Sequence, residues 1–165
     1  MSEDLGGTAI EPLRRPRLVL FSARDRLYAS RTERRRLLLA MRPADPTELG
    51  LAEHAQDQRV VGGAYWEYLR DDDTSLFMRA HDLASKPDAR EDARAVYMQA
   101  DEMRLVYVRD PATYRWGWWL VLGAEVMLVA GRMWLPGQRK QVVQNARKAI
   151  AALGSWPGWG TYYTL

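Results

Sequence analysis

Residues 110–137 read DPATYRWGWWLVLGAEVMLVAGRMWLPG, which is the densest apolar stretch of the chain. Asp110 is a good N-cap residue, Pro111 suits the first turn of a helix, and a Pro-Gly pair follows Leu135. The stretch therefore predicts one long helix that begins at Pro111 and ends at Leu135. A helix this apolar needs either lipid or other protein around nearly all of its surface.

A membrane span is the first alternative for this helix. Residues 116–135 have about the length that a bilayer requires, and tryptophans near both ends are typical of an interfacial belt. Glu125, near the midpoint, costs on the order of 2.5 to 3.5 kcal/mol in a bilayer, and Arg132 adds to that cost. Insertion would be close to neutral in free energy, so we favour protein surroundings and keep a single-span membrane protein as an alternative.

The helical wheel of the same stretch favours crowding by other helices. Glu125 and Arg132 fall seven residues apart on one stripe, and small residues line two others. Small residues let neighbouring backbones approach closely, and a chain of 165 residues has few helices with which to cover these faces. Copies of the same chain or a partner are therefore expected to cover them. The expected subunit-packing residues are Gly117, Ala124, Glu125, Gly131 and Arg132.

The remaining patterns predict a mainly α fold, a helical bundle formed by one domain over residues 17–154. Residues 138–153 carry apolar side chains at helical spacing, so they predict a second long helix antiparallel to the first. Helices are also expected over residues 22–41 and residues 49–70. Asp73 or Thr74 is expected to cap a further helical turn.

One segment ahead of the two long helices has a different pattern. Residues 91–109 fit a helix in part, but alternation and β-branched residues favour a short strand pair. We expect a β-hairpin that joins residues 95–99 to residues 104–109.

Both ends of the chain are expected to lie outside this domain. Residues 1–16 contain two prolines and predict a mobile or extended arm. Residues 155–165 read SWPGWGTYYTL, with aromatic side chains among glycines and no charge. Such a tail can dock into a pocket or add a strand to another sheet, although it can also fold over its own chain. The expected partner-docking residues are Trp156, Trp159, Tyr162, Tyr163 and Leu165.

No signature of catalysis stands out in the sequence. The absence of cysteine excludes disulfides, thiolate metal sites and cysteine nucleophiles. His54 and His81 have no hydroxyl or carboxylate at triad spacing, and the run Asp71–Asp73 is better explained by helix capping than by a cation. A Gly-rich phosphate loop is also missing. We therefore expect no enzymatic activity, no cofactor and no metal.

Nucleic-acid contact is a weaker hypothesis, based on a short basic run. The net charge of +3 is small for a dedicated nucleic-acid binder. Arg34, Arg35 and Arg36 could contact phosphate, but a solvated helix face is the commoner explanation of such a run.

The C-terminal half resembles a known family of structural proteins. A strand ending in LVYVRDPATYRW, the long stretch WGWWLVLGAEVMLVAGRMWL, a brief turn and QRKQVVQNARKAIAAL follow one another over residues 95–153. This succession is similar to the C-terminal part of bacteriophage head-to-tail adaptor proteins of the tail-tubular type. In that family a strand leads through Asp-Pro into two antiparallel helices.

The resemblance implies a structural ring component of a phage neck. Such a connector is a homo-oligomer, commonly a dodecamer, that binds the portal protein above it and a downstream tail protein below it. It extends the channel through which DNA passes without sequence-specific binding, and it is found in the virion after assembly in the host cytoplasm. The alternatives are a soluble oligomeric scaffold protein and the single-span membrane protein with its helix at residues 116–135.

Overall fold

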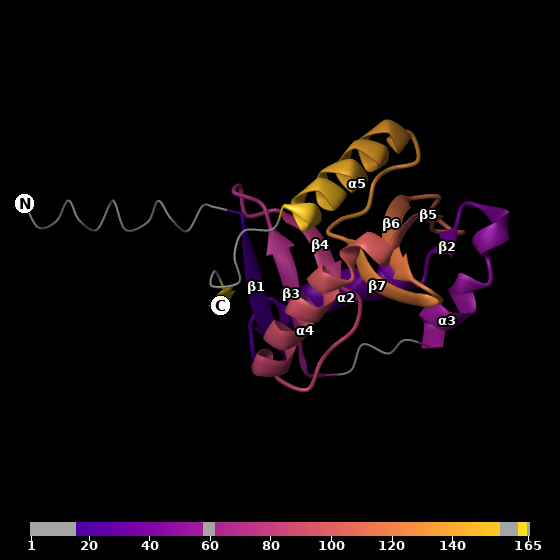
Figure 1. Ribbon diagram of the computed structural model, residues 1–165. Helices are drawn as coiled ribbons and strands as arrows, with labels where there is room; N and C mark the ends of the chain where they lie inside the picture. The colour runs from indigo at the N-terminus through magenta and orange to yellow at the C-terminus, as the bar shows by residue number, and fades with distance from the viewer. Residues whose placement is uncertain (1–15, 58–61, 156–161, 165) are drawn as a thin grey trace, which may run out of the picture.

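The computed structural model describes residues 16–57, 62–155 and 162–164. These residues form one eight-stranded sheet in the order β2-β5-β6-β7-β4-β3-β1-β8 (Figure 1). Neighbouring strands are antiparallel, except that β8 runs parallel to β1. The strands are β1 (Arg17–Ser22), β2 (Arg42–Pro43), β3 (Ala64–Leu69), β4 (Ser75–Arg79), β5 (Arg104–Arg109), β6 (Trp116–Leu122), β7 (Glu125–Ala130) and β8 (Tyr162–Thr164). The helices are α2 (Tyr28–Leu39), α3 (Leu51–Asp57), α4 (Lys86–Met98) and α5 (Arg139–Gly154), with short 3-10 turns η2 (Pro46–Glu48) and η3 (Ala100–Glu102).

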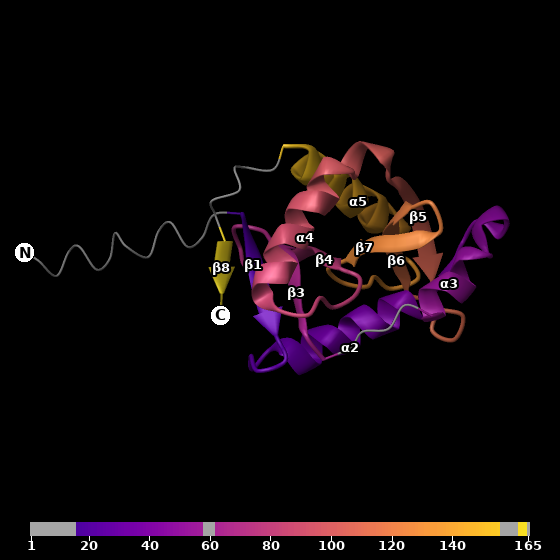
Figure 2. The same cartoon turned by 60° about the horizontal axis from the view of Figure 1, so that its bottom comes forward.

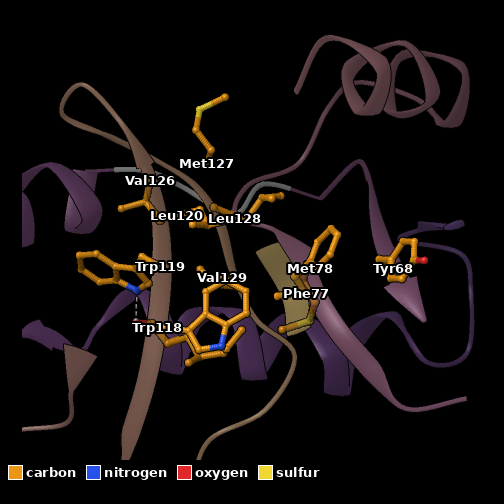
Figure 3. Close-up of a cluster of buried hydrophobic side chains, with 14 of the residues drawn as sticks. Tyr68, Phe77, Met78, Trp118, Trp119, Leu120, Val126, Met127, Leu128 and Val129 are labelled. Carbon is orange, nitrogen blue, oxygen red and sulfur yellow. Dashed lines mark hydrogen bonds between the residues drawn. The ribbon is translucent and has the colours of Figure 1, made fainter. Parts of the chain in front are cut away.

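Helices cover both faces of the sheet. Figure 2 shows α4 and α5 on one side of it and α2 on the other. Successive tryptophans of β6 point to opposite faces (Figure 3): Trp118 donates its indole N–H to Asn145 of α5 over 2.9 Å, and Trp119 donates to the carbonyl of Leu38 in α2, also over 2.9 Å. Because neither face of β6 meets water, the residues that point to either face can be apolar, and the strand needs no alternation of polar and apolar residues.

The predicted helical bundle is wrong, because residues 111–135 form two strands and not a helix. Leu122 pairs with Glu125 across a two-residue turn, and Gly123 begins that turn with a φ of 62°. Glycine adopts this left-handed conformation at little cost, which suits the first central position of a hairpin turn. A continuous apolar run fits a strand buried on both faces as well as it fits a buried helix, and here the glycine divides it into a hairpin.

The helix at residues 116–135 on which the single-span alternative depends is therefore not formed. In the part of the chain that the structure describes, every helix is too short or too polar to cross a bilayer. The charged stripe is not formed either, since Glu125 begins β7 and Arg132 follows the end of that strand.

Two expected elements are confirmed, but the strand predicted at residues 95–99 is not formed. Residues 104–109 form β5, and the helix expected over 138–153 is α5. Residues 95–99 lie at the end of α4 and pair with no strand, so the predicted hairpin is not formed. Helix α4 begins with a common N-cap: the side chain of Ser85 accepts a hydrogen bond from the amide of Asp88 at 3.3 Å.

The predicted N-terminal helices are shorter than expected. The helix over residues 22–41 is reduced to α2, because β1 occupies the chain up to Ser22. The helix over residues 49–70 is wrong in its second half, where β3 begins at Ala64. Asp73 caps no helix: it has a φ of 68° in the turn between β3 and β4.

Candidate functional site

A cleft of about 970 Å³ lies at one end of the sheet. Its walls are the turn between β3 and β4, the segment that follows β7, and the sides of α2 and α5. Figure 1 shows this turn beside α5, at the end of the sheet where β1 begins. The lining residues are Arg31, Arg34, Arg70, Asp72, Asp73, Thr74, Ser75, Arg115, Gly131, Arg132, Met133, Trp134, Leu135, Gln138, Gln141, Gln144, Asn145 and Lys148.

The wall made by the β3–β4 turn is held by its own hydrogen bonds. The amide of Arg70 donates to the carbonyl of Thr74 at 2.8 Å. Asp72 accepts from the amide of Thr74 at 3.1 Å and from its hydroxyl at 2.6 Å. These hydrogen bonds, with a smaller effect from the charge of Arg70, lower the pKa of Asp72. Asp73 forms an ion pair of 2.5 Å with Arg17, so this carboxylate is already neutralised within the chain.

The segment after β7 is fixed against two strands. The amide of Gly131 donates to Leu76 of β4 at 3.2 Å. A Cβ atom at Gly131 would lie 2.2 Å from the carbonyl oxygen of Ser75, so only glycine allows this approach. Trp134 and Trp116 exchange two backbone hydrogen bonds of 2.8 and 2.9 Å. The wall is therefore a continuation of the sheet and not a free loop.

Helices α2 and α5 supply polar side chains from the two sides of the cleft. Arg34 of α2 donates to the carbonyl of Gly131 at 2.9 Å, and Arg31 pairs with the buried Glu67 at 2.6 Å. On α5 the polar residues of the cleft follow one another at spacings of three and four, which places them on one side of the helix. They are Gln141, Gln144, Asn145 and Lys148.

The cleft is strongly cationic. Six lining side chains are Arg or Lys and two are carboxylates, while the whole chain carries only +3. Among the described residues, Arg31 is the one of the six cations that forms an ion pair. Arg34 is engaged by the carbonyl of Gly131 instead, which leaves Arg70, Arg115, Arg132 and Lys148. Arg115, Arg132 and Lys148 are also exposed to solvent. The positive charge of the cleft is therefore available to a ligand.

A buried ionic network lies behind the cleft and anchors α2 to the sheet. Arg35 is fully buried, pairs with Asp82 at 2.7 Å and stacks over the ring of Tyr65 at 3.4 Å. Tyr28 donates its hydroxyl to the same carboxylate, and burial together with this hydrogen bond raises the pKa of Tyr28. These groups pair with one another away from solvent, with the Nε of Arg35 left without a hydrogen-bond partner among the described residues. The network is best explained as structural.

A second charged contact holds α4 to the opposite face. Arg79 of β4 pairs with Asp92 of α4 at 2.7 Å and also donates to the carbonyl of Met127 at 2.7 Å. Trp66 donates its indole N–H to the same aspartate at 2.8 Å. Buried arginines therefore explain part of the arginine content of the chain.

The structure separates the three arginines proposed for phosphate contact. Successive helical residues differ by about 100° in direction: Arg34 lines the cleft, Arg35 is buried, and Arg36 is exposed outside the cleft. The basic run is therefore neither one patch nor one solvated face, although one of its members belongs to the cationic cleft.

The residues proposed for subunit packing lie in three separate places. Gly131 and Arg132 line the cleft. Ala124 is exposed in the turn between β6 and β7, and Glu125 is exposed at the start of β7. Gly117 is buried inside the chain, where a Cβ atom would lie 2.6 Å from the side chain of Leu38 and 3.2 Å from that of Met41. Its small size therefore serves the packing of α2 on β6 within one chain.

Of the residues proposed for partner docking, Trp156, Trp159 and Leu165 lie outside the described residues. Tyr162 and Tyr163 belong to β8, whose backbone pairs with β1 of the same chain. The strand propensity of this segment is therefore used within the chain.

Sequence reasoning missed several lining residues. The polar side of α5 was visible as the complement of its apolar face, and Gln141, Gln144 and Lys148 all lie on it. Arg70 and Arg115 carry no such signal, because they enter the cleft from the ends of different strands that only the folded sheet brings together. Ser75 also lines the cleft, and its hydroxyl is buried with no hydrogen-bond partner among the described residues.

Both histidines lie outside the cleft. His54 is exposed on α3. His81 is half-buried, and burial together with the charge of Arg79 lowers its pKa. Within the described ranges, no group of three or more His, Cys, Asp or Glu residues is placed to hold a metal ion.

The fold and the cleft define a mixed α/β protein with a single antiparallel-based sheet and a donor-rich cleft at its end. Comparisons of the chain with protein-family models, with curated proteins and with solved structures find no match. The functional argument therefore depends on the geometry of the cleft.

Proposed function

We propose that this chain is a binding protein that takes an anionic ligand in the cleft between the β3–β4 turn and α5. The observation that carries the proposal is the convergence of Arg70, Arg115, Arg132 and Lys148 without an ion pair among the described residues. Hydrogen bonds to charged groups contribute about 1.5–3 kcal/mol each. A ligand that engages several of these cations at once would therefore bind with useful affinity.

Binding is better supported than catalysis by the chemistry of the lining. A nucleophile needs a neighbouring base or a lowered pKa. Ser75, the serine of the cleft, has no hydrogen-bond partner among the described residues, and neither histidine lines the site. Asp72 has a lowered pKa, which makes it a weaker base than an ordinary carboxylate. The residues present are those of an anion receptor.

The experiment is a titration with a fluorescent heparin oligosaccharide, followed by anisotropy at low ionic strength and at about 0.15 M salt. Arg132→Gln and Lys148→Gln each remove one exposed cation of the cleft. Arg147→Gln is the matched control, because Arg147 is exposed on the same helix but does not line the cleft. We expect the two cleft variants to weaken binding severalfold and the control to leave it nearly unchanged.

Equal losses in all three variants would contradict the proposal, because they would show attraction by the net charge of the protein. Absence of binding by the parent chain at both ionic strengths would contradict it directly.

The phage head-to-tail adaptor remains a separate prediction. The helix pair on which that resemblance was based is not formed, because residues 111–135 are a β-hairpin. Ring formation is the property that tests it, and negative-stain images of the purified protein, alone and mixed with a portal ring, would show it. Steady monomers under both conditions would argue against a neck connector.

A further inference from the structure

We infer that the ligand of the cleft is an extended acidic segment of a partner protein, with its main chain held by the amide side chains of α5. This inference rests on the proposed anion-binding function and names the class of ligand. It starts from a feature that an anion receptor does not need: four carboxamides line the same cleft as the arginines, namely Gln138, Gln141, Gln144 and Asn145.

Two of these carboxamides have a fixed orientation. Asn145 accepts the indole N–H of Trp118 through its Oδ1 atom at 2.9 Å, and Gln138 accepts the amide of Leu135 through its Oε1 atom at 3.0 Å. With the oxygen of each group engaged, its NH₂ group is the part left to donate. These two residues are therefore suited to main-chain carbonyl oxygens or carboxylates.

The other two carboxamides can both donate and accept. Gln141 and Gln144 are exposed, and their side chains form no hydrogen bond among the described residues. A polypeptide in extended conformation presents alternating N–H and C=O groups, which such amides match in both senses. A phosphodiester backbone offers only hydrogen-bond acceptors. It would engage the NH₂ groups of these amides and leave their oxygens unused.

The length of the polar side fits a short peptide. From Gln138 to Lys148 the helix rises about 15 Å, at 1.5 Å per residue. An extended chain covers that distance in about four or five residues, with alternate side chains on opposite sides. Acidic residues at every second position would then share one side of the peptide, while Arg70, Arg115 and Arg132 line the same cleft as the polar side of α5.

The same lining disfavours a nucleic acid. Single-stranded nucleic acids bind through exposed aromatic rings on which bases stack. Trp134 is the aromatic residue among the described lining residues, and it is only 4% exposed, with the guanidinium of Arg132 over its ring at 5.2 Å. Asp72 can also accept a peptide N–H through its second oxygen, and a phosphodiester backbone has no such donor to offer.

The test compares two probes on three proteins. The probes are a fluorescein-labelled peptide in which glutamate alternates with alanine and a labelled oligothymidylate of equal charge. The proteins are the parent chain, the double variant Gln141→Ala/Gln144→Ala, and Gln99→Ala, a glutamine at the end of α4 outside the cleft. Each is also titrated with the heparin oligosaccharide.

We expect the parent to bind the glutamate peptide more tightly than the oligothymidylate. The double variant changes no charge, so it should weaken peptide binding about tenfold, equivalent to about 1.4 kcal/mol, and leave heparin binding nearly unchanged. The Gln99 variant should match the parent with every probe.

Two results would overturn the inference while the anion-binding proposal stands: tighter binding of the oligothymidylate than of the peptide, or a double variant with unchanged peptide affinity. If neither heparin nor the peptide binds the parent chain, both proposals fail together.

Discussion

Replacing Gly131 with alanine tests the junction of β4 and β7, on which one wall of the cleft depends. The new Cβ atom would lie 2.2 Å from the carbonyl oxygen of Ser75 and 2.5 Å from its carbonyl carbon. Both are backbone atoms, so no change of rotamer relieves the overlap. Overpacking of this kind costs about 1–3 kcal/mol. The shift also weakens the 3.2 Å hydrogen bond from Gly131 to Leu76, a contact worth about 0.5–1.5 kcal/mol.

The expected loss in the free energy of unfolding is therefore about 2–4 kcal/mol. Urea denaturation followed by tryptophan fluorescence measures it, and for a slope of about 2 kcal/mol per M the midpoint falls by about 1–2 M. Gly137→Ala is the control, because Gly137 is exposed and a Cβ atom there meets nothing within 4 Å. The control should change stability by less than about 0.5 kcal/mol.

The sign of the change also separates the two folds that the sequence allows. Inside the predicted helix, alanine at Gly131 would stabilise the chain by up to about 1 kcal/mol. In the sheet it destabilises, because the backbone of β4 occupies the space. A Gly131→Ala protein as stable as the parent would refute the packing of this junction as described.

Three further predictions follow from single residues. Gly123→Ala should lower the free energy of unfolding by about 1–2 kcal/mol in urea melts, because the φ of 62° is unfavourable for alanine. Arg35→Met should cost about 3–5 kcal/mol, since it leaves a buried carboxylate partner without its counter-charge, whereas Arg36→Met, at an exposed site, should change stability by less than about 0.5 kcal/mol. Burial and the charge of Arg79 lower the pKa of His81, so the folded chain binds this proton less readily than the unfolded chain. Its contribution to stability is then complete above the unfolded pKa of about 6.5 and is lost as the pH falls through and below that value. His81→Asn should flatten this part of the stability curve, measured by urea melts at several pH values.

The fold was predictable where one pattern dominated. Residues 138–153 combine an apolar face with a polar one, and residues 104–109 are rich in β-branched side chains, so α5 and β5 have the local preference that they adopt. The run from Trp116 to Ala130 has no such preference, because a sheet covered on both faces removes the alternation of polar and apolar residues that marks a strand. Gly123 divides this run into two strands, but in the sequence a glycine at this position fits a small residue on a helix face equally well.

The site was less predictable than the fold. Arg132 and Gly131 were singled out by spacing on a helix that does not exist, and they reach the cleft because they follow the end of β7. Arg70 comes from the end of β3, and Arg115 precedes β6. Residues so distant in sequence meet only through the strand order of the sheet, which local patterns do not contain.

The state of the nearby carboxylates supports the proposal that the cleft binds an anion and is not merely a solvated basic surface. Glu67 is engaged by Arg31, Asp73 by Arg17, and one oxygen of Asp72 accepts two hydrogen bonds from Thr74. Among the described residues the remaining cations of the cleft form no ion pair, although the charge of Arg70 acts on Asp72. An incoming anion would therefore displace mainly water and salt. Interactions of this kind weaken as ionic strength rises, because exposed charges are screened beyond about 8 Å at 0.15 M salt. Contacts to the carboxamides of α5 should be much less sensitive to salt. The salt dependence of affinity therefore separates the part of recognition that comes from the arginines from the part that comes from the amides.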